Sequence, residues 1–244
     1  MIIIHPDHKR FLDLLDEWQF LDIESLHSLS GQIRERSLDS IRRILKRLQQ
    51  KNAIKIYRDP WTKKNFYYLN EVLRKAFYPQ SISDVEGSSL YHDLLVSRLS
   101  LEILKYDRVF KKTDLEHRIK EGSKKSLFNE IVPDARMYGE IQGKSFVASV
   151  ELELHQKEKR RIVAKAKNYF NSTYYNHAFY FFTDENTMKN YYKIIKEELG
   201  EEFNQKIFLF YTRSFFSKTI SLSDGNGFVS GKGASFDKVF GGIR

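Results

Sequence analysis

The chain has 244 residues, which is long enough for one large domain or two small ones, and two are preferred. Its 41 Lys and Arg outnumber its 32 Asp and Glu, so the formal net charge of +9 favours polyanionic partners such as nucleic acid or an anionic membrane surface. Because it has no cysteine, the chain can form no disulfide, no thiolate zinc site and no cysteine nucleophile.

Neither a signal peptide nor a membrane span is expected. The start, MIIIHPDHKR, has too short an apolar run for a signal peptide, and nowhere do about 18 apolar residues follow one another. We therefore expect a protein with no membrane partner, and the absence of cysteine suits the reducing interior of the cytoplasm.

Residues 1–78 are predicted to form three helices followed by a β-hairpin. Asp22 can cap the second helix, and a third helix is expected from about Ser37 to Lys51. In this third helix, apolar residues recur at helical spacing along one stripe, while cationic residues project elsewhere. The segment AIKIYRDPWTKKNFYYL then alternates, turns at Asp59 and alternates again, which is typical of a hairpin.

Three helices followed by a basic hairpin is the element order of a winged helix-turn-helix. In that arrangement the third helix enters the major groove of double-stranded DNA, and the hairpin lies over neighbouring phosphates. The alternative is that the basic face of the helix is only a solvated surface. The basic helix, the basic hairpin and the order of the elements together favour nucleic-acid binding. The residues expected to contact DNA are Arg42, Arg43, Lys46 and Arg47 on the third helix, and Lys63 and Lys64 on the hairpin.

Residues 79–87 are predicted to be a linker, because Pro79, Gly87 and several serines interrupt the pattern. A second domain is expected over 88–218, and its order of helix, three strands, helix and strand indicates an α/β sheet with helices on its faces. The expected helices lie near 89–105, 158–170 and 185–198, and the expected strands near 108–110, 132–138, 145–154, 178–183 and 206–212.

Residues 219–244 hold six of the twelve glycines of the chain. This composition predicts a flexible tail or an irregular edge. Phe228, Phe236 and Phe240 are the side chains that would dock it.

Acidic residues of two expected strands carry the strongest chemical signal. A hairpin that turns at Gln142 and Gly143 places Asp134 opposite Glu151. Like charges in such positions destabilise a sheet unless a cation or a proton compensates them. Carboxylate oxygens such as these are the hard ligands that Mg²⁺ or Mn²⁺ binds. Such a metal can activate water for attack on a phosphodiester.

Two alternatives to a metal site stay open at this point. Charged residues that alternate with apolar ones also suit a half-exposed strand. Arg136, which alternation places on the same face, is a second way to neutralise the carboxylates without a metal.

The order of helix, strand, strand with Pro133-Asp134, strand with Glu151 and then helix is similar to the PD-(D/E)xK nuclease-like fold. The chain departs from that motif at Glu153, where the motif has lysine. The resemblance implies that a lysine of the next helix takes this place. The catalytic residues that it implies are Asp134, Glu151, Glu153 and either Lys165 or Lys167, with Asp134 and Glu151 on the metal. The expected fold class is α/β (α+β), a winged helix-turn-helix followed by a restriction-endonuclease-like αβββαβ domain.

Joined to a winged helix, the pattern resembles the replication-relaxation family of plasmids and other mobile elements. This resemblance covers about residues 8–183. It rests on Pro133-Asp134, Glu151-x-Glu153, Lys165 with Tyr169, and Tyr91-His92-Asp93-Leu94. It implies DNA binding in replication, mobilisation or plasmid regulation, with a relaxase or replication protein as a partner. It leaves catalysis open, because nuclease-like domains often lose activity.

Two other functions compete with this main interpretation. The first is a magnesium-dependent endonuclease that uses the acidic site. The second is a transcription regulator whose C-terminal domain dimerises or senses a ligand. A stable homodimer would favour the second.

Overall fold

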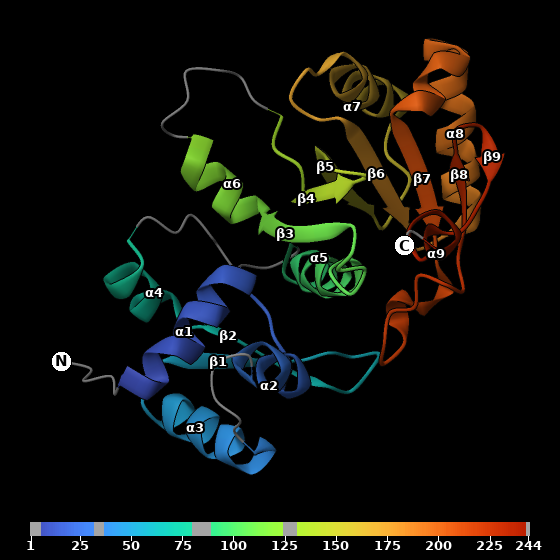
Figure 1. Cartoon of the computed structure of the whole chain (residues 1–244). Helices are drawn as coiled ribbons and strands as arrows, with labels where there is room; N and C mark the ends of the chain where they lie inside the picture. Colours follow the sequence, from blue (N-terminus) through green and yellow to red (C-terminus); the bar gives the residue numbers. More distant parts are fainter. Residues whose placement is uncertain (1–5, 32–36, 80–88, 124–130, 243–244) are drawn as a thin grey trace.

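The computed structural model describes residues 6–31, 37–79, 89–123 and 131–242. The molecule is a mixed α/β protein in which a helical part with a two-stranded hairpin packs beside a seven-stranded mixed sheet (Figure 1). In the described ranges, none of the helices is both long and apolar enough to cross a membrane.

The N-terminal part has the predicted order of three helices and an antiparallel hairpin. Its elements are α1 (Pro6–Trp18), α2 (Ile23–Gly31), α3 (Leu38–Gln50), β1 (Ile54–Arg58), β2 (Asn65–Leu69) and a short α4 (Glu71–Phe77), which the sequence did not predict. Asp22 caps α2 as expected, since its Oδ1 accepts a hydrogen bond from the Ser25 amide at 2.8 Å.

Helix α3 buries one face and exposes the other, as its spacing predicts. Ile41, Ile44, Leu45 and Leu48 are buried, whereas its arginines and lysine point into solvent. Ser37 precedes the helix and caps it by accepting a hydrogen bond from the Ser40 amide.

The α/β part contains the predicted elements and some others. Its elements are α5 (Leu90–Ile103), β3 (Phe110–Leu115), α6 (Glu116–Ser123), β4 (Ala135–Ile141), β5 (Lys144–Glu153), α7 (Lys159–Asn171), β6 (His177–Phe182), α8 (Glu185–Leu199) and β7 (Ile207–Tyr211), followed by β8 (Asn226–Val229), β9 (Lys232–Gly233) and α9 (Phe236–Phe240). Strand β3 begins at the end of the expected strand near 108–110, and α6 is a helix that the sequence pattern did not predict.

The strands lie in the sheet in chain order, β3 to β9. Strands β3, β4 and β5 pair antiparallel, β5, β6 and β7 pair parallel, and the last two strands add antiparallel. Helix α5 lies on one face of the sheet, and α7 and α8 cover the other (Figure 1). Strand β6 shows the division, because Phe179 packs on the α5 side and Tyr180 on the α7 side.

The segment after Lys218 forms the edge of the sheet, which is one of the two structures that its composition predicts. Strands β8 and β9 extend the sheet, and α9 returns toward its α5 side. Phe236 and Phe240 are buried there, and both rings contact Phe110 and Phe179. Phe228 docks on the other face, where its ring stacks on that of Tyr192 at 4.2 Å, so all three phenylalanines expected to dock this segment do so.

The helical part and the sheet share a continuous core. One cluster of buried apolar residues includes Phe11 of α1, Leu99 of α5 and Phe240 of α9. Asp16 joins α1 to α6, because its carbonyl accepts a hydrogen bond from His117 Nε2 at 2.8 Å and its carboxylate pairs with Arg118 at 2.6 Å. The predicted linker falls almost entirely on 80–88, outside the described residues, so the division into domains stays a prediction.

The buried His117 gives the contact between α1 and α6 a pH dependence. Burial lowers the pKa of its imidazole to about 4, against about 6.5 in an unfolded chain. As the pH falls below 6.5, the unfolded chain therefore binds a proton that the folded chain does not. We expect the free energy of unfolding to fall by about 2 kcal/mol more between pH 7 and pH 5 in the wild type than in His117→Gln.

Urea denaturation at the two pH values measures this difference. The control is His27→Gln, which changes an exposed histidine of α2. An equal loss of stability in the wild type and His117→Gln would show that His117 does not take part.

Candidate functional site

The register of β4 and β5 brings the two predicted acidic residues together. Ile141 pairs with Lys144 and Ala135 with Val150, so the hairpin turns at Gln142 and Gly143 as predicted. Both turn residues have positive φ, 52° and 77°, which matches a tight hairpin. Continuing this register by one pair places Asp134, which directly precedes β4, opposite Glu151.

Asp134 is held at this position by the backbone of β5. Its Oδ2 accepts a hydrogen bond from the Leu152 amide at 2.7 Å. Glu151 and Glu153 lie on the face that α7 covers, while Val150 and Leu152 belong to the core on the α5 side. The predicted alternation of acidic and apolar residues along β5 is therefore confirmed.

Helix α7 supplies two hydrogen-bond donors to Glu151, whose side chain is only 1% exposed. Lys165 Nζ donates to Oε2, and the Tyr169 hydroxyl donates to Oε1. These donors are four residues apart, so they lie on the same side of the helix. Lys167 is exposed and its Nζ lies 3.9 Å from Glu198, so Lys165 is the lysine that faces the sheet.

Helix α5 contributes His92, which was not among the predicted site residues. Its Nε2 lies 3.3 Å from Asp134 Oδ2 and 3.1 Å from the Leu152 carbonyl oxygen, and its Nδ1 lies 3.4 Å from Asp93 Oδ1. The pattern Tyr91-His92-Asp93-Leu94 contained it, but only as a point of family resemblance. The contact with Asp134 joins segments that are far apart in the chain, and no local pattern indicates it.

The charges of the site are set by burial and by these contacts. Burial raises the pKa of the Glu151 carboxyl to about 8, and the charge of Asp134 adds to the rise, while Lys165 and Tyr169 oppose it. Burial would also raise the pKa of Asp134, but the hydrogen bond and charge of His92 hold it below its ordinary value. Burial would lower the pKa of His92, whereas Asp134 and Asp93 raise it to about 11.

Lys165 remains charged in the same surroundings. Burial would lower its pKa, but the charges of Glu151 and Asp134 raise it above the ordinary value for lysine. At neutral pH the site therefore combines the Asp134 carboxylate with the imidazolium of His92 and the ammonium of Lys165.

Buried oxygen atoms without a hydrogen-bond partner lie on the same face of the sheet. Among the described residues, Glu153 Oε2, Ser149 Oγ and the Tyr180 hydroxyl have none. Burial raises the pKa of Glu153, whose closest described cation is Lys157 at 3.9 Å. Unsatisfied oxygen atoms beside two carboxylates are what a hydrated cation or ordered water would satisfy.

Two carboxylates are the kind of ligand that magnesium or manganese would need. No group of three or more histidine, aspartate or glutamate side chains suited to a metal occurs in the described part of the chain. Mg²⁺ does not require such a group, because it is commonly held by one or two carboxylates and completes its shell with water and substrate phosphate. Asp134 and Glu151 are the residues that would hold it.

Arg136 was the predicted rival for neutralising the acidic pair. Its guanidinium donates to the Tyr175 hydroxyl at 3.1 Å from Nη2 and to the Tyr138 hydroxyl at 3.4 Å from Nη1. The cations in contact with Asp134 and Glu151 are His92 and Lys165, which come from helices on the two faces of the sheet.

The cationic face of α3 is a second candidate surface. Arg42, Arg43, Lys46 and Arg47 are all exposed, and Arg42 pairs with Asp39 at 2.6 Å. In Figure 1 this helix lies at the end of the molecule opposite α7. The two candidate sites are therefore well separated.

The two hairpin lysines have partners within the protein. Lys64 is half-buried, and its Nζ lies 3.0 Å from Asp22 and 3.6 Å from Glu24. Lys63 is exposed, and its Nζ donates to the Pro60 carbonyl at 2.6 Å. Lys64 thus ties the hairpin to α2, and Lys63 is the lysine whose charge faces solvent.

The tip of this hairpin docks on the α/β part. Asp59 is fully buried, and its Oδ2 lies 4.0 Å from Arg98 of α5. Arg98 also donates to the carbonyls of Phe215 at 3.2 Å and Ser217 at 2.6 Å. The Trp61 ring lies 5.2 Å from the ring of Phe216. These contacts fix the hairpin against the sheet-bearing part of the molecule.

Comparison with known proteins gives only weak similarities. No family model and no curated protein matches the sequence. Among solved structures, the restriction endonuclease FokI has a TM-score of 0.27 and 11% identity, over 78% of this chain and 40% of that chain. The structure of FokI bound to DNA has a TM-score of 0.28 and 11% identity, over 86% of this chain and 43% of that chain. The chain therefore spans less than half the length of these proteins, and TM-scores this low support no conclusion about function.

Above pH 8, where the Glu151 carboxyl is ionised, its ion pair with Lys165 should show strong energetic coupling. Removing Lys165 leaves the charge of Glu151 buried, and removing Glu151 leaves the half-buried ammonium of Lys165 without this partner, whereas removing both leaves neither charge. We expect Glu151→Gln and Lys165→Met each to lower the free energy of unfolding, and the double variant to recover about 1–3 kcal/mol relative to their sum.

Urea denaturation of the four proteins in this cycle at pH 9 measures the coupling, because the Glu151 carboxyl is ionised there. The matched control is the exposed pair of Lys167 and Glu198, changed to Met and Gln, for which we expect coupling within about 0.5 kcal/mol. Coupling that is equally small in both cycles would contradict the charged, buried pair.

Proposed function

We propose that the protein binds double-stranded DNA through a winged helix-turn-helix and cleaves phosphodiester bonds in a magnesium-dependent, restriction-endonuclease-like α/β part. One observation carries this proposal. Asp134, Glu151 and Lys165 come from three different segments and meet at one point of the sheet. Two carboxylates and a lysine are the side chains that metal-assisted phosphodiester hydrolysis uses.

Each residue of the site has a role in this proposal. Asp134 and Glu151 would hold the metal, which activates water and stabilises the charge that develops on phosphate. The ammonium of Lys165 would orient a phosphate oxygen or the attacking water by charge-assisted hydrogen bonding. His92 and Tyr169 hold the two carboxylates in position through the contacts described above.

The element order supports the two finer fold assignments. The sequence α5, β3, β4, β5, α7 and β6 agrees with an αβββαβ arrangement into which α6 is inserted. Helices α1 to α3 followed by the β1–β2 hairpin agree with a winged helix, with α3 as the helix that enters the major groove.

The second candidate function is a DNA-binding protein of the replication-relaxation type that does not cleave. This candidate is supported by the residues on which that resemblance rests, because five of them lie in one site. These are His92, Asp134, Glu151, Lys165 and Tyr169. In this case Lys165 and His92 neutralise the acidic pair as a structural network. The protein would then act by binding DNA in plasmid or mobile-element replication, mobilisation or regulation, together with a relaxase or replication protein.

Cleavage tests the first proposal. With Mg²⁺ or Mn²⁺ present, we expect the wild type to nick supercoiled plasmid. Asp134→Asn and Lys165→Met should each reduce the rate by about 100-fold or more, because each removes a group that acts on the reacting phosphate. Lys167→Met is the matched control, since that lysine lies on the same helix but faces away from Glu151.

Calorimetric titration with Mg²⁺ accompanies the nicking assay. Binding that disappears in Glu151→Gln supports the metal site. If the wild type neither binds the metal nor nicks DNA but still binds DNA, the non-cleaving candidate replaces the first proposal.

DNA binding by α3 is tested by its dependence on salt. Each phosphate that a cationic side chain neutralises releases counterions, and it adds about 0.9 to the magnitude of the slope of log affinity against log salt. We expect the double variant Arg43→Gln, Arg47→Gln to bind duplex DNA more weakly, with a slope reduced in magnitude by about 2. Fluorescence anisotropy at several salt concentrations measures both quantities.

The control removes the same charge from a different surface. Lys189 and Lys193 of α8 are exposed, and their change to glutamine should leave both affinity and slope unchanged. Equal effects of the two double variants would mean that overall charge, and not α3, accounts for binding.

A further inference from the structure

A group of tyrosines and cations lies beside the acidic site and has no part in the proposed chemistry. It is built by Tyr138 and Arg136 of β4 and by Tyr174 and Tyr175, which follow α7. We call these four residues the tyrosine platform. Lys112 and Asp114 of β3 border it, since they pair with Tyr138 and Arg136 in the sheet register.

The platform adjoins the acidic site on the same face of the sheet. Arg136 pairs with Ser149, and Glu151 is two residues further along the same strand, so their side chains share a face. Two residues of a strand span about 7 Å. The ring of Tyr175 also packs at 5.6 Å from the ring of Tyr169, which contacts Glu151. A nucleotide on the platform would therefore lie within one or two nucleotides of a phosphate at Asp134 and Glu151.

Hydrogen bonds hold the platform in one conformation. Arg136 donates from Nε and Nη2 to the Tyr175 hydroxyl, at 3.3 Å and 3.1 Å. The Tyr138 hydroxyl accepts from Arg136 at 3.4 Å and donates to Asp114 at 2.8 Å. The rings of Tyr138 and Tyr175 and the guanidinium of Arg136 are thus oriented before any ligand arrives, which lowers the entropic cost of binding.

Part of the platform is open to solvent. Tyr174 is 42% exposed although the guanidinium carbon of Arg136 lies 4.7 Å above its ring centre. Lys112 Nζ lies 5.1 Å from the centre of the Tyr138 ring, and the Lys112 side chain is 65% exposed. Exposed aromatic rings next to cations are the features with which proteins bind unpaired nucleotides, through base stacking and attraction for the backbone.

We infer that the tyrosine platform binds an unpaired nucleobase of the DNA substrate, by stacking on Tyr174, next to the phosphate at the acidic site. The inference rests on the proposed function and specifies its substrate class. In a continuous duplex the faces of each base are covered by its neighbours, so only an unpaired, bulged or single-stranded nucleotide offers a free face. The substrate is then DNA with such a nucleotide at the cleavage position.

The test measures binding without cleavage, in the full-length Glu151→Gln variant. The probes are two fluorescein-labelled duplexes that differ only in one additional, bulged 2-aminopurine, which the fully paired duplex lacks. We expect tighter binding of the bulged duplex and a change in 2-aminopurine fluorescence on binding. Adding Tyr174→Ala should weaken binding of the bulged duplex by about 5-fold or more and leave the paired duplex unchanged.

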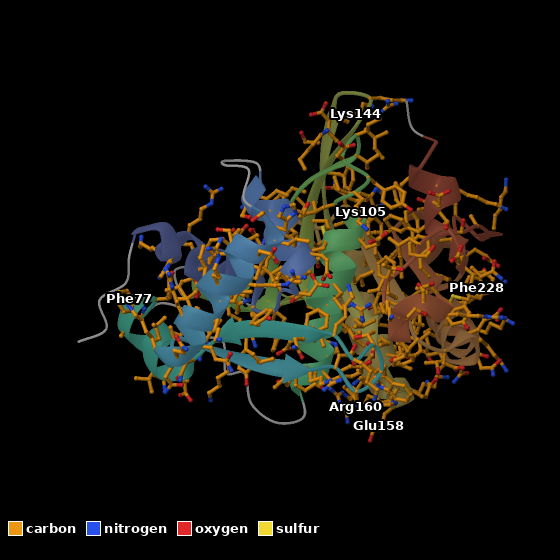
Figure 2. All side chains as sticks on the ribbon, turned by 90° about the horizontal axis from the view of Figure 1, so that it is seen from below. Phe77, Lys105, Lys144, Glu158, Arg160 and Phe228 are labelled. Carbon is orange, nitrogen blue, oxygen red and sulfur yellow. The ribbon has the colours of Figure 1, made fainter. Side chains whose placement is uncertain are left out.

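Two further variants make the test specific. Tyr174→Trp keeps a stacking ring and should retain the preference for the bulged duplex. Phe77→Ala removes another exposed aromatic residue, from α4, which Figure 2 shows at one end of the molecule, and should have no effect. Loss of affinity in Tyr174→Trp as large as in Tyr174→Ala would mean that the ring does not act by stacking.

Equal affinities of the two duplexes, or equal affinities with and without Tyr174→Ala, would overturn the inference. These outcomes are independent of the proposed cleavage. A protein that never nicks DNA can still show the Tyr174-dependent preference, and an active nuclease can lack it.

Discussion

The carboxylates of Asp134 and Glu151 repel each other across two paired strands, and the rest of the site follows from compensating that repulsion. Like charges opposite each other destabilise a sheet unless cations or a proton compensate them, and the raised pKa of Glu151 means that a proton contributes at neutral pH. His92 reaches Asp134 from α5 on one face of the sheet, and Lys165 reaches Glu151 from α7 on the other. The acidic pair therefore connects both layers of helices to one pair of strands.

The sequence predicts the part of this site that depends on local geometry. A hairpin register follows from its turn, so Gln142 and Gly143 were enough to place Asp134 opposite Glu151. The choice between Lys165 and Lys167 depends on how α7 rotates against the sheet, which spacing within the helix leaves undecided. The contact of His92 with Asp134 depends on how a distant helix packs. The pattern Tyr91-His92-Asp93-Leu94 therefore contains His92 without indicating its role.

Other features lay beyond sequence reasoning for similar physical reasons. The glycines after Lys218 indicate an absence of regular structure, yet two short strands form there because β7 offers an unpaired edge. Phe236 and Phe240 gain their burial from rings of β3 and β6, which are distant in the chain. Lys64 was expected to face phosphates, and its pairing with Asp22, at the start of α2, depends on tertiary packing that the alternation of the hairpin does not reveal.

The docked tip of the β1–β2 hairpin has a consequence for where DNA would be cut. Asp59, Arg98 and the rings of Trp61 and Phe216 join the hairpin to α5 and to the segment after β7. Helix α3 and helix α7 lie at opposite ends of the molecule (Figure 1). With the hairpin held by these contacts, they would set the distance between a duplex bound at α3 and a bond held at Asp134. Under the proposed function, the number of base pairs between the recognition sequence and the cleavage position would therefore be the same for every bound DNA.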